Sequence, residues 1–334
     1  MIKRLLVGLD GSHFAEGALP YAEALARASD ALVTLVRVVP NLSEAPQPPP
    51  DDGEPQEREA SPRVFAALLE SPREDRNRRH EAEHYLDEIA AHLMGNKVRS
   101  ETALGFGDPA QFIIDEALAR AANLIILGTH GRSGLGRWIY GSVADQVMRH
   151  APVPVLLVPN NSRAWPRTRP PRILVPLDGS PVANEAIGSA KELAELLGAE
   201  MTLVGAVPPP IYAYTYADMP QEIPEQLDDE QVDLHRYLEE VANDLRTTGR
   251  IVRTEVAFDS PVSAISDIAR QKEIDLIVMS THGSGGVTRL VIGSVANGVI
   301  RRVNVPVLVV RPAVNRANEA PPVANQQGHD LPMG

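Results

Sequence analysis

The chain of 334 residues contains no cysteine. This absence excludes disulfide bonds, thiol nucleophiles, iron–sulfur clusters and zinc sites that are built from cysteine. It also means that cysteine usage says nothing about the redox compartment in which the protein works.

Long apolar runs are missing as well. No stretch approaches the roughly 18 apolar residues that suggest a membrane-spanning helix. The apolar run at residues 5–9 is too short for the hydrophobic region of a signal peptide, and no small-residue cleavage site follows it. We therefore expect a soluble cytoplasmic protein without a membrane partner.

Basic and aromatic residues are scarce. Lys and Arg number 32 against 44 Asp and Glu, which gives a formal net charge of −12, and aromatic residues make up only 4%. An acidic chain lacks the basic face that neutralises phosphates of a nucleic acid, and few aromatics limit the stacking of single strands. Nucleic acid polymers are therefore excluded as main partners, whereas a hydrophobic fraction of 43% suffices for two ordinary cores.

What the sequence does contain is an internal repeat. Residues 4–12 (RLLVGLDGS) match residues 172–180 (RILVPLDGS), and residues 129–158 match residues 281–310 in the same order. Two long matches in the same order indicate a duplicated domain, whereas a solenoid would repeat with a much shorter period.

The composition between and after the copies sets the predicted boundaries. The segment between the copies is rich in Pro, Asn and Arg, which is typical of a short, stiff linker. The C-terminal segment is polar and has no periodicity, which predicts disorder. The predicted parts are domain 1 at 1–158, the linker at 159–171, domain 2 at 172–311 and a disordered tail at 312–334.

Within each copy, short apolar runs alternate with helical patterns, which predicts an open doubly wound α/β sheet with helices on both faces. The apolar run 5–9 is the predicted first strand of copy one. The later strands are predicted at 32–39, 97–104, 124–127 and 153–158 in copy one, and at 201–207, 250–257, 276–279 and 305–310 in copy two. Ser12 and Ser180 are predicted N-caps of the first helices, which run to about Ser29 and Leu197. The second helices are predicted at 75–94 and 229–247. The later helices open at Asp108-Pro109, Ser260-Pro261, Gly141-Ser142 and Gly293-Ser294. Two Pro-rich acidic segments, 40–62 and 208–230, are predicted to be long mobile insertions.

Two features of each copy follow the ends of predicted strands, where ligands bind in such sheets. Asp10, or Asp178 in copy two, ends the first strand, and a glycine-rich loop follows the fourth. Glycines and a helix N-terminus can together bind a phosphate chain through backbone N–H groups. The loop is not a Walker motif, because Arg137-Trp138 stands where that motif has Lys-Ser/Thr, and no Rossmann fingerprint follows the first strand.

The loop of copy one has the spacing G-2x-G-9x-G-S at Gly128, Gly131, Gly141 and Ser142. With this motif in place, the chain resembles a tandem universal stress protein of the ATP-binding branch. The resemblance implies two five-stranded parallel sheets of order 3-2-1-4-5, with ATP between strands one and four. It implies ATP binding with stress signalling, without dedicated catalysis, and a divalent Mg²⁺ or Mn²⁺ held by the phosphates.

The resemblance also implies roles for residues at matching positions. Asp10 contacts the ribose or adenine, Gly8 lets the base approach, and the backbone of Val38 faces the adenine. Gly128 and Gly131 border the ribose and phosphates, which the last helix holds. All nucleotide-contacting positions so implied are Gly8, Asp10, Val38, Gly128, Gly131, Arg132, Gly141, Ser142, Val143, Asp178, Ala206, Ser280, Gly283, Gly293, Ser294 and Val295. No catalytic residue and no metal-ligating side chain is predicted.

Copy two departs from the motif at two positions. Pro176 replaces Gly8 and lacks an N–H group, and Ser280 replaces Gly128 and is bulkier. We therefore predict that nucleotide binding is weaker in copy two.

The family's last strand pairs across a two-fold axis, and here copy one can pair with copy two. The sequence leaves open whether the whole chain also forms a homodimer, and it names no protein partner.

Several alternatives stand beside this interpretation. Asp10 and Asp178 are good turn residues in their own right. His130 and His282 have no carboxylate nearby in sequence to make them general bases. His80 and His84 have the spacing of metal ligands but lack a third ligand, so a polar helix face is favoured. A weak ATPase or phosphotransferase, and an interaction scaffold that needs no nucleotide, are the competing functions.

Overall fold

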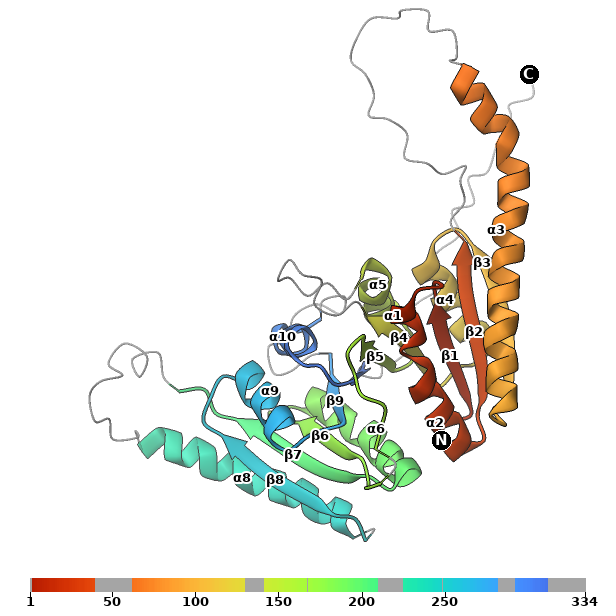
Figure 1. Ribbon diagram of the computed structural model, residues 1–334. Helices are drawn as coiled ribbons and strands as arrows, with labels where there is room; N and C mark the ends of the chain where they lie inside the picture. The colour runs from red at the N-terminus through yellow and green to blue at the C-terminus, as the bar shows by residue number, and fades with distance from the viewer. Residues whose placement is uncertain are drawn as a thin grey trace, which may run out of the picture.

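Ten strands form one continuous sheet in the part of the chain that the structure describes (Figure 1). The structure is a computed structural model, and it describes residues 2–39, 62–129, 141–166, 168–209, 225–247, 249–281 and 292–311, without side chains at 62–75 and 225–228. The order is β3-β2-β1-β4-β5-β10-β9-β6-β7-β8. Each half, domain 1 (β1–β5) and domain 2 (β6–β10), therefore has the order 3-2-1-4-5, which confirms the predicted fold.

The elements alternate along the chain as a doubly wound sheet requires. The strands are β1 (Arg4–Leu9), β2 (Leu32–Val39), β3 (Ser100–Phe106), β4 (Leu124–Thr129), β5 (Val155–Pro159), β6 (Arg172–Pro176), β7 (Glu200–Ala206), β8 (Val252–Ala257), β9 (Leu276–Ser280) and β10 (Val307–Val310). The helices are α1 (His13–Glu16), α2 (Leu19–Ser29), α3 (Pro62–Gly95), α4 (Pro109–Ala119), α5 (Ser142–His150), α6 (Pro181–Leu197), α8 (Glu225–Arg246), α9 (Pro261–Gln271) and α10 (Ser294–Arg302). Among the described residues, no helix is both long enough and apolar enough to cross a membrane.

The two halves join through their last strands. Strand β5 pairs with β10 in antiparallel register, with Leu156 opposite Leu308, whereas the ladders within each half are parallel. Both leucines are at most 2% exposed. The predicted pairing of copy one with copy two is confirmed, and it removes two apolar edges from solvent.

The apolar core forms two layers, one on each face of the sheet. One cluster lies under α2, α3, α6 and α8, and the other lies under α4, α5, α9 and α10. Each cluster contains residues of both halves, for example Leu156 with Leu308 in the first and Leu157 with Val307 in the second. The halves therefore share their core at the junction.

Helix starts follow the predicted capping residues. The hydroxyl of Ser12 accepts the N–H of Ala15 at 3.2 Å, and that of Ser180 accepts the N–H of Ala183 at 3.1 Å. Asp108 and Ser260 cap α4 and α9, with Pro at the first helical position in both.

Several element boundaries differ from the prediction. Helix α3 begins at Pro62 and α8 at Glu225, so residues 225–230 are helical and the prediction of an insertion there is wrong. A proline is compatible with the first turn of a helix, because the N–H it lacks would have no partner there. The predicted start of the third strand at Lys97 is also wrong, because Lys97 has φ +61°, a left-handed conformation that ends α3. The last strands begin at Val155 and Val307, two residues later than predicted.

Of the other predicted insertion residues, Pro208 and Pro209 lie in the described part after β7, whereas 40–61 and 210–224 lie outside it, as does the predicted tail at 312–334. Their predicted mobility stays a prediction.

The first helix of domain 1 is split, whereas that of domain 2 is continuous. Helices α1 and α2 are separated at Gly17 and Ala18, although the backbone there stays near helical angles. Pro20 has no N–H to donate to the carbonyl of Glu16, and its ring crowds that carbonyl. The equivalent position in α6 is Gly188, so α6 runs without interruption from Pro181 to Leu197.

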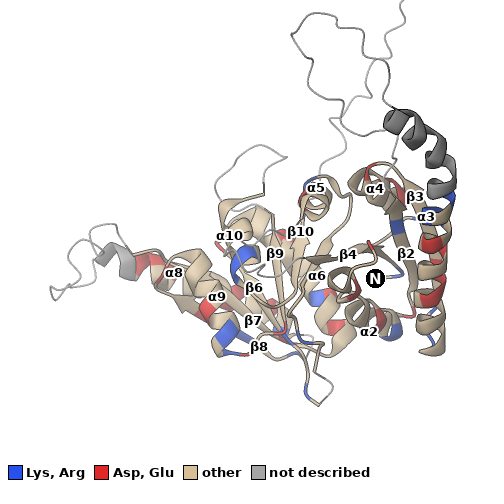
Figure 2. Cartoon of the chain, turned by 45° about the horizontal axis from the view of Figure 1, so that its top comes forward, with Lys and Arg blue, Asp and Glu red and all other residues tan. Residues whose placement is uncertain are grey.

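Charged residues are distributed along the helices (Figure 2). On α3, basic residues of the described part come first and acidic residues follow toward its C-terminus (Figure 2). His84 on this helix lies 3.5 Å from Glu88, and both side chains are exposed.

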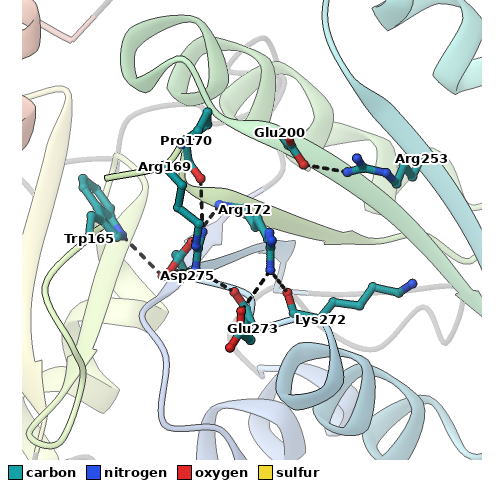
Figure 3. Close-up of polar contacts among 9 residues, drawn as sticks. All are labelled: Trp165, Arg169, Pro170, Arg172, Glu200, Arg253, Lys272, Glu273 and Asp275. Carbon is teal, nitrogen blue, oxygen red and sulfur yellow. Dashed lines mark hydrogen bonds and ion pairs between the residues drawn. The ribbon is translucent and has the colours of Figure 1, made fainter. Parts of the chain in front are cut away.

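The linker is held to both halves. The Tyr21 hydroxyl of α2 donates to the Arg163 carbonyl at 2.5 Å, and its ring meets that of Trp165 edge-on at 5.1 Å. Trp165 donates its indole N–H to the Asp275 carbonyl at 3.3 Å, and Arg169 pairs with the Asp275 carboxylate at 2.7 Å (Figure 3). The linker therefore bridges α2 of domain 1 to the start of β9 in domain 2.

We predict that Tyr21 makes stability fall at alkaline pH. Burial raises the pKa of its hydroxyl from 10.0 to about 12, so the folded state holds this proton more tightly than the unfolded state. The stability that Tyr21 contributes is complete below pH 10 and is lost as the pH rises toward 12. A rise of the pKa from 10.0 to about 12 corresponds to about 2–3 kcal/mol of free energy of unfolding. Urea unfolding of wild type and Tyr21→Phe should show the wild type more stable by about 1 kcal/mol at pH 7.

That difference should shrink and reverse above pH 10, because Phe does not ionise. Parallel pH profiles of the two proteins would contradict the assignment.

Candidate functional site

The turn after the first strand is built alike in both halves. Oδ1 of Asp10 accepts the N–H of Ser12 at 2.8 Å. Oδ1 of Asp178 accepts the N–H of Ser180 at 3.0 Å and its hydroxyl at 2.6 Å. Both aspartates are exposed, and each holds a turn as the alternative interpretation stated. Within the described residues, Oδ2 of Asp10 accepts no hydrogen bond, so that oxygen can meet a ligand.

The end of the second strand offers backbone groups beside this turn. The carbonyl of Val39 accepts the N–H of Gly107 at 3.2 Å and so faces β3. Neighbouring residues of a strand direct their backbone groups to opposite sides, so Val38 faces β1. The β1–β2 ladder ends at the pair Leu9–Arg37, and the backbone of Val38 lies just beyond it.

Ala206 occupies the equivalent place in domain 2. The N–H of Leu177 donates to the carbonyl of Val204 at 2.8 Å, and the N–H of Val207 donates to Ala257 at 2.9 Å. Ala206 therefore faces the side of β6, beyond the last residue of that strand. The backbone arrangement of Val38 thus recurs in domain 2 at Ala206.

Gly8 has a packing reason of its own. A Cβ at this position would lie 2.6 Å from Leu127 and 3.1 Å from Ile113, so the core leaves no room for a side chain. In domain 2, Pro176 takes this place, and the β6–β9 ladder has only the pairs Ile173–Leu276 and Leu174–Ile277, whereas β1 pairs with β4 through Gly8. Pro176 therefore ends the contact between strands one and four earlier in domain 2.

Gly128 also makes room for the protein itself. A Cβ there would lie 2.2 Å from the carbonyl oxygen of Phe14 and 2.7 Å from Cα of Ala15, because the backbone of α1 rests on the end of β4. In domain 2 the equivalent residue is Ser280, which is buried beside the continuous helix α6. The glycine of domain 1 therefore accompanies the split helix.

The last helix of each half begins without a side-chain cap. Gly141 precedes α5 with φ +86°, a conformation that favours glycine, and its carbonyl accepts the N–H of Asp145 at 3.0 Å. Gly293 precedes α10 with φ −56°, and its N–H donates to Thr281 at 2.7 Å. The first-turn residues at these helix starts are Ser142, Val143, Ser294 and Val295. Their N–H groups lie at the positive end of the helix dipole.

Part of the predicted site lies outside the described residues. This holds for Gly131, Arg132 and Gly283, whose implied contacts with the nucleotide stay predictions. His130 and His282 also lie outside the described residues.

Sequence reasoning missed three side chains beside the Asp10 turn. Arg37 of β2 reaches over Gly11, and its guanidinium lies 4.8 Å from the ring centroid of Tyr85 of α3. The Tyr85 hydroxyl donates to Oε1 of Glu16 at 3.2 Å. Burial, and after it the Glu16 carboxylate, raises the pKa of this tyrosine. A polar Arg37 inside the apolar run 32–39 was the signal available in the sequence.

Domain 2 has the same tyrosine contact. Tyr237 of α8 donates its hydroxyl to Oδ1 of Asn184 in α6, and burial raises its pKa. It has no counterpart of Arg37, because Gly205 occupies that position. No cluster of three or more His, Asp or Glu side chains suited to a metal occurs among the described residues, those of α3 included.

Known proteins match the chain over most of its length. The model of the universal stress protein family matches residues 1–159 and 171–311. A universal stress protein of Mycolicibacterium smegmatis is 26% identical over 317 residues, which cover 92% of this chain and 97% of that protein. One of Mycobacterium tuberculosis is 27% identical over 334 residues, covering 92% and 94%. The crystal structure of a universal stress protein from Archaeoglobus fulgidus matches with TM-score 0.64 and 20% identity, covering 92% and 98%, which supports the fold.

We predict that Gly128→Ala destabilises the protein and that Gly188→Ala does not. The new methyl group at 128 meets the Phe14 carbonyl, and such overpacking costs about 1–3 kcal/mol. No atom lies within 4 Å of a Cβ at Gly188, where alanine gains about 0.5–1 kcal/mol as a better helix former. Urea unfolding of both variants checks this. Equal midpoints would show that α1 does not rest on β4.

Proposed function

Because the chain belongs to the universal stress protein family, we propose that it is a stress-response protein that binds ATP at the carboxyl edge of the strands. The observation that carries the proposal is the shared edge of β1 and β4. These strands pair in parallel, so the Asp10 turn and the end of β4 at Thr129 lie at the same edge of the sheet, and α5 is the next described element of the chain. A crevice beyond adjacent parallel strands is the usual ligand position in such folds.

Each group at this edge suits one part of a nucleotide. Oδ2 of Asp10 can accept a ribose hydroxyl, and the backbone of Val38 can pair with the edge of the adenine. The N–H groups of Ser142 and Val143, with the Ser142 hydroxyl, can hold phosphates at the start of α5. A Mg²⁺ or Mn²⁺ ion would be held by the phosphates, since this set of groups contains one carboxylate.

We expect domain 1 to bind more tightly than domain 2. In domain 2 the N–H of Gly293 is already used by Thr281, and Pro176 shortens the contact between β6 and β9. In domain 1 the N–H of Gly141 has no such partner among the described residues, and β1 stays paired with β4 through Gly8. Binding costs less free energy when the groups that contact the ligand are already held in place, and we expect this to make nucleotide binding tighter in domain 1.

The proposed role is binding with signalling, and catalysis is not part of it. The groups assigned above are mainly backbone amides and an aspartate that holds a turn, and these position a ligand without supplying a nucleophile or a general base. Nucleotide occupancy would then be read by a protein partner.

We predict that the purified protein, denatured and examined by mass spectrometry, releases an adenine nucleotide, and that ATP with Mg²⁺ raises its melting temperature. Gly141→Glu should remove binding in domain 1, because a carboxylate at the start of α5 repels phosphates. The matched variant Gly293→Glu should remove only the weaker domain 2 binding. Isothermal titration of each full-length variant measures the domain that still binds. The dissociation constant of domain 1, in Gly293→Glu, should be about tenfold lower than that of domain 2, in Gly141→Glu, or lower still.

Equal affinities in the two variants would overturn the ranking of the domains. Absence of released nucleotide together with no thermal shift would favour the interaction scaffold. Sustained ATP turnover that Gly141→Glu abolishes would favour the enzyme.

A further inference from the structure

A cation lies over the Asp10 turn in domain 1. Nη2 of Arg37 is 3.1 Å from the position that a Cβ of Gly11 would take, and Cζ is 3.3 Å from it. Gly11 has φ +85° and stands between Asp10 and Ser12. The guanidinium therefore touches the turn that holds the candidate ligand carboxylate.

Aromatic stacking keeps this cation in place. The guanidinium of Arg37 lies 4.8 Å from the centroid of the Tyr85 ring, and Tyr85 is in turn held by its hydrogen bond to Glu16. In the part of the chain that the structure describes, no carboxylate forms an ion pair with Arg37. Its charge is therefore available to a ligand at the turn.

Domain 2 provides a natural comparison, because it has the same turn without the cation. Gly205 stands at the position of Arg37. A Cβ at Gly205 would lie 2.6 Å from Cδ2 of Leu234, so the packing leaves no room for a side chain there. Gly179, the equivalent of Gly11, has φ +79°, and among the described residues no atom lies within 4 Å of its Cβ position. The position that places a guanidinium over the turn in domain 1 therefore supplies no side chain in domain 2.

The charge of Arg37 bears on which ligand domain 1 prefers. Asp10 and Asp178 each place a carboxylate at the edge of the sheet, which repels an anionic ligand. In domain 1 the Arg37 guanidinium offsets that repulsion, and in domain 2 the equivalent position is Gly205, which carries no charge. We propose that Arg37 is a specificity-determining residue of domain 1, which makes this site prefer phosphorylated adenine nucleotides over the uncharged nucleoside.

This proposal rests on the proposed function, since it assumes that the edge binds an adenine compound. It adds that one residue of domain 1, Arg37, sets the preference of that site for ATP over adenosine.

The test measures both ligands on the full-length chain. In a Gly293→Glu background, which leaves domain 1 to report, isothermal titration gives the dissociation constants of ATP and adenosine. Arg37→Gln should weaken ATP binding about tenfold and adenosine binding by less than about threefold, because only ATP uses the charge. Arg37→Lys keeps the charge and should restore most of the ratio. The ATP difference between wild type and Arg37→Gln should shrink at high salt.

Arg79→Gln is the matched control. Arg79 also stacks on an aromatic ring, lying 4.6 Å from the centroid of Phe106, but it belongs to α3 and not to the turn. Its variant should leave both dissociation constants unchanged. Thermal melting confirms that each variant is folded.

The outcomes separate the two proposals. Equal weakening of ATP and adenosine in Arg37→Gln, or no change in either, would overturn the role of Arg37 and leave the proposed function standing. Failure of the wild type to bind any adenine compound would overturn the proposed function and this inference together.

Discussion

The antiparallel pairing of β5 with β10 is the contact on which the architecture depends. Both strands are apolar throughout, and the residues of their ladder, such as Leu156 and Leu308, are almost fully buried. A half on its own would expose this strand as an unpaired apolar edge, which is a template for aggregation. Because both copies belong to one chain, each supplies the other's missing neighbour at high effective concentration. The shared core layers at the junction follow from that pairing.

The linker strengthens the same junction by its contact with Asp275 of domain 2, whose equivalent in domain 1 is Asn123. In domain 1, Oδ1 of Asn123 accepts the N–H groups of Lys3 and Arg4 and so fixes the start of β1. The equivalent residue in domain 2 is Asp275, which accepts the N–H of Arg172 at the start of β6. Its carboxylate additionally pairs with Arg169 of the linker, which a neutral asparagine could not do as an ion pair (Figure 3). A shared structural role was thus kept while a charge was added.

The repeat and the helix caps could be predicted because they depend on local patterns, whereas the strand order was implied only by the resemblance to the family. Ser12 and Ser180 cap their helices, and the apolar runs form buried strands, as their spacing requires. The bounds of α3 could not be predicted, since its first turns follow a Pro-rich segment and carry no clear stop or start signal. The split of the first helix could have been predicted from Pro20, because an interior proline removes one helical hydrogen bond.

The candidate site was harder to predict, because its side chains come together through tertiary packing. Asp10 and Gly141 follow from the motif, but the position of Arg37 depends on Tyr85. Tyr85 lies on a helix that begins more than twenty residues after β2 ends, and nothing local in the sequence pairs the two. Gly8 and Gly128 show the opposite case, since both were expected to make room for a ligand and both also make room for packing.

Two differences between the copies are structurally linked: the form of the first helix and the residue at the end of the fourth strand. Pro20 splits the first helix and Gly128 accepts the displaced backbone of α1, whereas domain 2 combines Gly188 in a continuous helix with a side chain at Ser280. If the two positions in each pair depend on each other, changing one alone should cost more than changing both. The tyrosine contact to the first helix is meanwhile kept in both copies, through Glu16 in one and Asn184 in the other. The duplicated halves therefore keep the same framework around the turn after the first strand, and they differ in the backbone space beside it and in the charge at the position of Arg37.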